Sequence, residues 1–237
     1  MRVELGRAGK CWLVGAAAVF SGFAGLPFYG QASSQDAGQP SGQAFVQMEY
    51  TNAGLTPSHW VLKIHPDGSA QFDSEGGSTP RQDVRQIEAG DVHRSVQLSQ
   101  SFTDQVFAVA RQRKLFAFPC ESHMKVAFQG TKRLSYSGPE GGGACSYNYS
   151  KDKTIQALGN SLVAVEATIL SGARMEKLLQ HDRLGLDAEL DSLQEGVEQG
   201  NALEISTIRE TLTRIAGDEE VLERARKKAR LLLTQVR

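Results

Sequence analysis

The sequence has few cysteines, few aromatic residues and no excess of charge of either sign. Its 237 residues include three Cys, 7% aromatic residues, and 26 basic against 27 acidic side chains. This balance argues against a general electrostatic attraction of the whole protein to nucleic acid. With 40% hydrophobic and 22% charged residues, the composition is that of an ordinary globular protein. It excludes the collagen-like, disordered and polytopic membrane classes.

No apolar run is long enough to span a membrane. The longest, residues 11–26, falls short of the roughly 20 apolar residues that a spanning helix needs, and it follows a basic segment over residues 1–10. Small residues at 30–32 then complete the pattern of a secretory signal. We therefore expect 1–32 to be a signal peptide cut after Ala32, a periplasmic or secreted location, and no stable membrane span after cleavage. An uncleaved signal anchor is the alternative.

Cleavage would also remove Cys11 and leave Cys120 and Cys145 as the only cysteines. An even pair in a chain bound for an oxidising compartment predicts a disulfide, and two buried free thiols are the alternative. By the chain-entropy argument, a bond that closes a loop of this length stabilises the fold by about 3 kcal/mol.

The remaining chain changes character once, near residue 150. Residues 33–43 contain no large apolar side chain, so we expect a flexible leader. Residues 44–150 have an apolar period near two, and residues 151–237 have a helical period. The sequence therefore predicts an α+β fold. In it, a disulfide-stapled antiparallel sheet with an inserted helix precedes a mainly helical region, which packs on the sheet or forms a second small domain.

Within 44–150, alternating apolar residues predict strands, and His65-Pro66-Asp67-Gly68-Ser69 has the chemistry of a hairpin turn. The inserted helix is expected over 101–116, with Ser101 as its cap. The strands are expected at 45–50, 59–64, 70–72, 92–98, 124–129, 134–136 and 145–149.

The helical region has apolar residues at spacings of three and four, with Gly172, Gly185, Gly196 and Gly200 as expected breaks or caps. The last helix is expected to be capped by Asp218. It carries a basic cluster that fits a solvated face matched to the helix dipole; a nucleic-acid or lipid contact is the alternative.

The pattern Trp60-x-Leu62-x-Ile64-x-x-Asp67-Gly68, followed by a helix, a Cys, Gly130-x-Lys132 and a second Cys, resembles a family of small exported bacterial domains of unknown function. The resemblance covers about 58–170 and implies a ββαββα order and an envelope location. It implies no activity.

The motifs that mark common chemistries are absent from the sequence. It contains no Gly-x-Ser-x-Gly, no Gly-x-x-x-x-Gly-Lys-Ser/Thr, no His-Glu-x-x-His and no Cys-x-x-Cys. We therefore assign no catalytic, cofactor-binding or metal-binding residue and expect no cofactor. The leading hypothesis is a non-catalytic binding module of the bacterial envelope. Its partner is left open, with another envelope protein as one candidate and nucleic acid excluded.

Two other classes remain. An envelope hydrolase could assemble its site from residues distant in the sequence. An inhibitor or regulator of an envelope enzyme would be favoured if the loop at 73–91 projects as a rigid element. The candidate hydrolase residues are His59, Asp67, His93, His123 and the carboxylates near Asp182.

Overall fold

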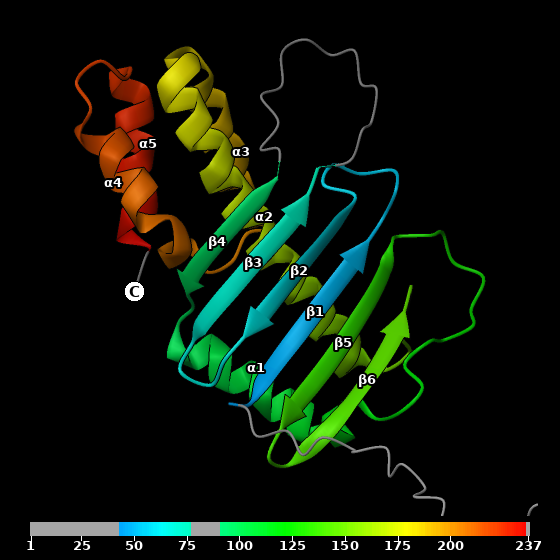
Figure 1. Ribbon diagram of the computed structural model, residues 1–237. Coiled ribbons are helices and arrows are strands. Elements are labelled where there is room, and N and C mark those ends of the chain that lie inside the picture. The colour runs from blue at the N-terminus through cyan, green and yellow to red at the C-terminus, as the bar shows by residue number, and fades with distance from the viewer. Residues whose placement is uncertain (1–42, 77–90, 236–237) are drawn as a thin grey trace, which may run out of the picture. The chain divides into compact units, whose positions relative to one another are not determined.

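Six antiparallel strands form the sheet at the centre of the structure, a computed structural model that describes residues 43–76 and 91–235. The predicted signal peptide, nearly all of the predicted leader and most of the 73–91 loop lie outside these residues. The sheet order is β4-β3-β2-β1-β5-β6 (Figure 1). The strands are β1 (Phe45–Thr51), β2 (His59–Ile64), β3 (Ser69–Glu75), β4 (Val92–Gln97), β5 (Thr131–Gly138) and β6 (Gly141–Tyr147).

The sheet is buried on one face because its strands alternate apolar and polar residues. Met48 of the central strand β1 pairs with Leu62 of β2 and Leu134 of β5, and all three side chains are fully buried. The predicted hairpin between β2 and β3 is confirmed, since the His65 amide donates to the Ser69 carbonyl at 2.9 Å. The opposite face carries mainly polar and charged side chains, and no helix covers it in Figure 1.

Helix α1 (Gln100–Gln112) is the inserted helix, and it packs Val106, Phe107 and Ala110 into the core. Its cap is Ser99 rather than Ser101, because the Ser99 hydroxyl accepts from the Phe102 amide at 3.3 Å. The helix also ends earlier than expected and is followed by the short 3₁₀ turn η1 (Lys114–Phe116).

Helix α2 (Lys153–His181) has 29 residues, which at 1.5 Å per residue is about 43 Å of helix. Its first part covers the sheet, and the buried cluster there extends to Ala173. Gly172 was expected to break this helix, but the helix runs through it. A Cβ at Gly172 would lie 2.3 Å from Ile208 Cγ2, so the glycine permits close packing instead.

The end of α2 contributes to a second buried cluster, which includes Met175, Leu178 and Leu179. The short turn η2 (Arg183–Gly185) follows α2, and the elements that complete this cluster are α3 (Leu186–Glu198), η3 (Ile205–Ile208), α4 (Arg209–Gly217) and α5 (Glu223–Thr234). Glu176 of α2 links the clusters, because its carboxylate pairs with Arg94 of β4 and accepts from the Thr211 hydroxyl of α4 at 2.8 Å. The described residues belong to one compact unit.

Helix α5 begins at Glu223, so the expectation that Asp218 caps it is wrong. Asp218 instead caps the preceding turn, where its carboxylate accepts from the Glu220 amide at 2.9 Å. The basic cluster of α5 faces carboxylates of α3. Lys228 lies 2.7 Å from Asp187, and Arg224 lies 2.8 Å from the same carboxylate. These ion pairs give that cluster a role in packing.

The α+β class, with an antiparallel sheet, an inserted helix and a mainly helical C-terminal region, is as the sequence predicts. Over residues 58–170, three strands, β2 to β4, precede the inserted helix, so one strand is added to the expected ββαββα order. None of the helices in the described ranges is long and apolar enough to cross a membrane.

Candidate interaction surface

The most unusual surface feature is the segment between η1 and β5. The predicted strand over 124–129 is wrong, because residues 117–130 form an irregular loop, and β5 pairs with β6 rather than with this segment. The alternating pattern of Met124, Val126 and Phe128 is that of a strand, but no neighbouring strand offers it a partner. We call residues 121–130 the apolar loop.

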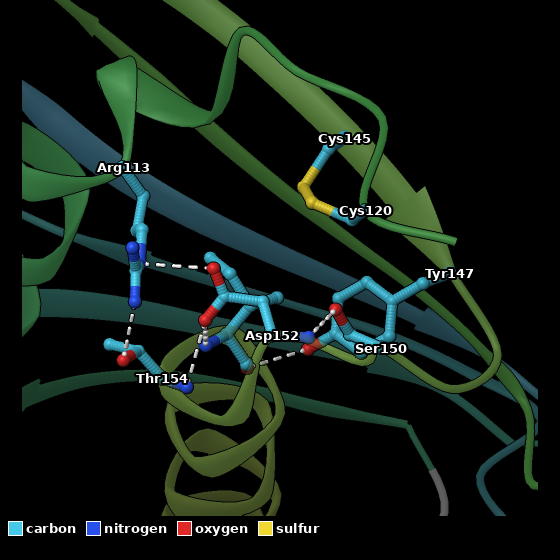
Figure 2. Close-up of polar contacts among 8 residues, drawn as sticks. Arg113, Cys120, Cys145, Tyr147, Ser150, Asp152 and Thr154 are labelled. Atoms are coloured by element: carbon cyan, nitrogen blue, oxygen red, sulfur yellow. Dashed lines mark hydrogen bonds and ion pairs between the residues drawn. A yellow bond between two sulfur atoms is a disulfide. The ribbon is translucent and has the colours of Figure 1, made fainter. Parts of the chain in front are cut away.

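Covalent and polar contacts attach the apolar loop to β6 and to the residues just after it. Cys120 and Cys145 form a disulfide with their Cα atoms 5.6 Å apart (Figure 2). Immediately after the bridge, the Ser122 amide donates to the Tyr149 carbonyl at 3.0 Å. The start of the loop is therefore fixed to the strand at the edge of the sheet.

Glu121 binds the backbone at this point. One carboxylate oxygen accepts from the amides of Ser122 and His123 at 2.7 and 3.2 Å, and the other accepts from the Asn148 amide at 2.7 Å. The bond from Asn148 is the main reason why the pKa of the Glu121 carboxyl is lowered, since amide donors favour the charged form. Glu121 therefore acts as an anchor for the loop.

The far end of the loop is held by Asn148 and Tyr50. The Asn148 side chain accepts from the Gln129 amide at 2.7 Å and donates to the Ala127 carbonyl at 3.1 Å. The Tyr50 hydroxyl donates to the Gln129 carbonyl at 2.6 Å. Gly130 lies against this ring with φ 99°, and a Cβ there would lie 2.5 Å from the ring. The sequence pattern assigns no role to Asn148, so this contact of the loop was not predicted.

Between these anchors the loop exposes three large apolar side chains. Met124 is 51% exposed, Val126 38% and Phe128 64%. Exposed apolar side chains are common singly, but several together on a protein surface mark interaction sites. These three lie within five consecutive residues on a segment that is attached at both ends.

Two shallow hollows lie at the first turns of α2, and the second of them adjoins the apolar loop. One lies between α1 and α2, has a volume of about 310 Å³ and includes Phe102 and Val109. The other, about 340 Å³, includes Met124 of the apolar loop. Lys153 and Ala157 line both hollows, and we call the two hollows together the cationic groove.

The charge of the cationic groove has one sign. Its charged lining residues are Lys151 and Lys153, and no carboxylate lines either hollow. The nearest carboxylate in sequence, Asp152, caps α2 by accepting from the Thr154 amide at 2.9 Å and pairs with Arg113 at 3.1 Å (Figure 2). Asp152 is therefore neutralised within the fold, and the two lysines give the groove a positive potential.

A buried cation lies at the base of the loop. Lys132 of β5 is 4% exposed and points to the core face, where its ammonium lies 5.6 Å from the centre of the Tyr50 ring and 5.9 Å from that of Tyr147. Burial lowers the pKa of Lys132, because the charged form is poorly solvated there. Lys132 lines neither hollow, and we assign it to the packing of β5 against its neighbours.

The structure separates the residues proposed for a hydrolase. His59 lies 3.3 Å from Glu49, and His93 lies 2.8 Å from Asp73, but both pairs lie on the uncovered face of the sheet and neither lines a hollow. His123 lies in the apolar loop.

The two remaining candidates for a hydrolase site, Asp67 and Asp182, form hydrogen bonds within backbone turns. Asp67 accepts from the Ser69 hydroxyl at 2.6 Å, and this bond is the main reason why the pKa of its carboxyl is lowered. Asp182 accepts from the Gly185 amide at 3.3 Å after the end of α2. Among the described residues, no group of three or more His, Cys, Asp or Glu side chains could hold a metal ion. No family model matches the sequence, and no curated protein matches it either.

Proposed function

We propose that this protein is exported to the bacterial envelope and acts there as a non-catalytic interaction module that binds through the apolar loop and the cationic groove. The observation that carries the proposal is the set of three exposed apolar side chains, Met124, Val126 and Phe128, on a loop held at both ends. A loop fixed before binding loses little conformational entropy when a partner covers it.

Export is supported by the sequence of residues 1–32 and by the disulfide, since such bonds persist mainly in oxidising compartments. Intact-mass measurement of the protein from its native envelope tests this part. We expect the mass of residues 33–237 and two alkylation sites that appear only after reduction. A full-length chain with freely alkylated cysteines would contradict it.

A hydrolase is supported less well. The two histidine–carboxylate pairs have hydrogen-bonding geometry, but a catalytic pair must face a space that can hold a substrate, and these pairs lie on the uncovered face of the sheet, away from both hollows. The regulator hypothesis depended on a rigid loop at 73–91, most of which lies outside the described residues.

Retention by isolated envelopes tests the interaction role. Purified mature protein is mixed with washed envelopes, which contain both membrane and envelope proteins, and the retained fraction is measured. We expect Phe128→Ser to weaken retention on the order of tenfold, because most of this large apolar side chain is available to a partner. Leu184→Ser is the matched control, since Leu184 is 70% exposed and follows the opposite end of α2. Equal retention of the wild-type protein and Phe128→Ser would contradict the proposal.

A further inference from the structure

We propose that the partner of this surface is the anionic face of a phospholipid bilayer, with the apolar loop inserted among the lipids and the lysines of the cationic groove on their headgroups. The inference rests on the proposed function and specifies its partner.

The first argument is the combination of side chains. Proteins that bind at a membrane interface bury apolar side chains at the boundary of the acyl chains and place Lys or Arg beside anionic headgroups. Here Phe128 and Val126 are exposed, Lys125 lies between them and Met124 in the sequence, and Met124 lines the same hollow as Lys151 and Lys153. Met124 of the apolar loop and the two lysines therefore meet on one surface.

The second argument concerns opposing charge, whose one source within the apolar loop is Glu121, held at the start of the loop by three backbone amides. No carboxylate lines the cationic groove, and Asp152 is paired with Arg113. The basic cluster of α5 shows the contrast, because Lys228 there contacts Asp187 and Asp191 within the fold. Neither Lys151 nor Lys153 has a carboxylate beside it in the groove, so both can meet an anionic partner.

The third argument is the backbone of the apolar loop. A backbone that enters an apolar environment needs its polar groups satisfied internally. The amides of residues 122, 123, 124, 126 and 129 donate to groups of the protein itself, whereas no such bond is made by the amides of 125, 127 and 128, so most but not all of these donors are satisfied before binding. The carbonyls of Ala127 and Gln129 accept from Asn148 and Tyr50.

These internal bonds also distinguish a bilayer from an acidic peptide. A peptide that adds to a protein as an extended strand needs free backbone donors and acceptors on its host. Between residues 122 and 129 most backbone amides of the loop already donate to groups of the protein itself, so the loop offers a partner mainly its side chains. A deformable hydrocarbon layer fits three protruding side chains without requiring a complementary cavity.

Co-sedimentation with protein-free vesicles tests the proposal. The purified mature chain, with its disulfide intact, is mixed with vesicles that contain phosphatidylglycerol or with vesicles of phosphatidylcholine alone. We expect binding to the anionic vesicles that weakens as salt is raised, because the headgroup attraction is screened. Binding to phosphatidylcholine alone should be weak.

Variants separate the apolar contribution to vesicle binding from the electrostatic one. Phe128→Ser should reduce binding on the order of tenfold by removing apolar contact. The double variant Lys151→Gln/Lys153→Gln should reduce it on the order of thirtyfold, from about 1 kcal/mol for each lysine near an anionic surface. Leu184→Ser and Lys227→Gln are the matched controls and should bind as the wild-type protein does, because both side chains are exposed elsewhere.

A tryptophan placed in the loop gives a direct readout. Trp60 is the only tryptophan after residue 32, and it is 1% exposed, so its emission should not respond to vesicles. Phe128→Trp should show a blue shift with anionic vesicles and quenching by brominated lipid. Leu184→Trp should show neither.

The outcomes separate this proposal from the one on which it rests. No binding to anionic vesicles, or equal losses in the control variants, would overturn the bilayer as the partner. If envelopes still retain the protein in a Phe128-dependent way, the partner is an acidic envelope protein and the interaction role stands. Loss of both vesicle binding and Phe128-dependent retention would overturn both proposals.

Discussion

Removal of the disulfide tests how much the bond between Cys120 and Cys145 stabilises the protein. The variant Cys120→Ser/Cys145→Ser opens a loop with a sequence separation of 25. The entropy regained by the unfolded chain should lower the free energy of unfolding by about 3 kcal/mol. That loss raises the unfolded fraction about 100-fold, yet it leaves a domain of ordinary stability folded. Both cysteines are replaced so that neither remains as a buried free thiol.

Urea unfolding monitored by two signals gives the assay. The fluorescence of Trp60 reports the sheet, where this ring is buried and stacks on Tyr50 with centres 5.4 Å apart. Far-UV circular dichroism reports the helices of both buried clusters. Because α2 contributes to both, we expect the two transitions to coincide and to shift together in the variant. Reduction of the wild-type protein should give the same shift.

Two results would refute this reasoning. A loss below about 1 kcal/mol would mean that the unfolded chain does not gain the entropy assumed. A shift in fluorescence alone would mean that the second cluster unfolds independently of the sheet, in spite of the continuous helix.

Three further predictions concern single residues. Gly172→Ala should lower the free energy of unfolding by about 1–3 kcal/mol through the clash with Ile208. In an Ile208→Ala background the same change should raise stability by up to about 1 kcal/mol, because helix propensity dominates there; thermal melts of the wild-type protein, the two single variants and the double variant measure both effects. The lowered pKa of Glu121 means that its hydrogen bonds stabilise the protein at pH values above the ordinary Glu pKa and that this stability is lost as pH falls through the lowered pKa. In urea melts at a series of acidic pH values, Glu121→Gln should reduce the dependence of the unfolding free energy on pH, and an unchanged dependence would argue against the role of Glu121 as an anchor. Burial raises the pKa of Glu166 to about 7, so between about pH 4.5 and pH 7 the folded state binds more protons than the unfolded state and stability falls as pH rises. Glu166→Gln should therefore be more stable than the wild-type protein at pH 8 by roughly 1–3 kcal/mol, and equal unfolding midpoints of the two proteins at pH 8 would show that this carboxyl is solvated.

The sheet could be predicted where local pattern and local turn agree. In β1 and β2 the apolar residues alternate, and the turn from His65 to Ser69 brings β2 and β3 together without help from distant parts of the chain. The helical period of α2 was equally clear, because its apolar residues recur over many turns. Such signals depend on neighbours in sequence, and the sequence contains them in full.

The errors lie where a distant partner decides the structure. The segment around Val126 has a strand pattern, but the edge of β6 is approached by η1, and a Cβ at Gly143 would lie 2.5 Å from the Leu115 carbonyl. Glycine has a low helix propensity, so Gly172 was expected to break α2, yet its packing against Ile208 overrides that propensity. The apolar loop and its groove belong to this class, because Glu121 and Asn148 meet only after folding.

The length of α2 explains why the chain has a second buried cluster. Five spacings between six strands measure roughly 24 Å, whereas 29 residues of helix measure about 43 Å. The end of α2 therefore extends beyond the sheet, and its apolar face at Met175, Leu178 and Leu179 would be open to solvent. Helices α3, α4 and α5 cover that face, as the shared buried cluster shows. Because these helices gather at the end of α2, none of them contributes, within the described residues, to the two hollows at its beginning.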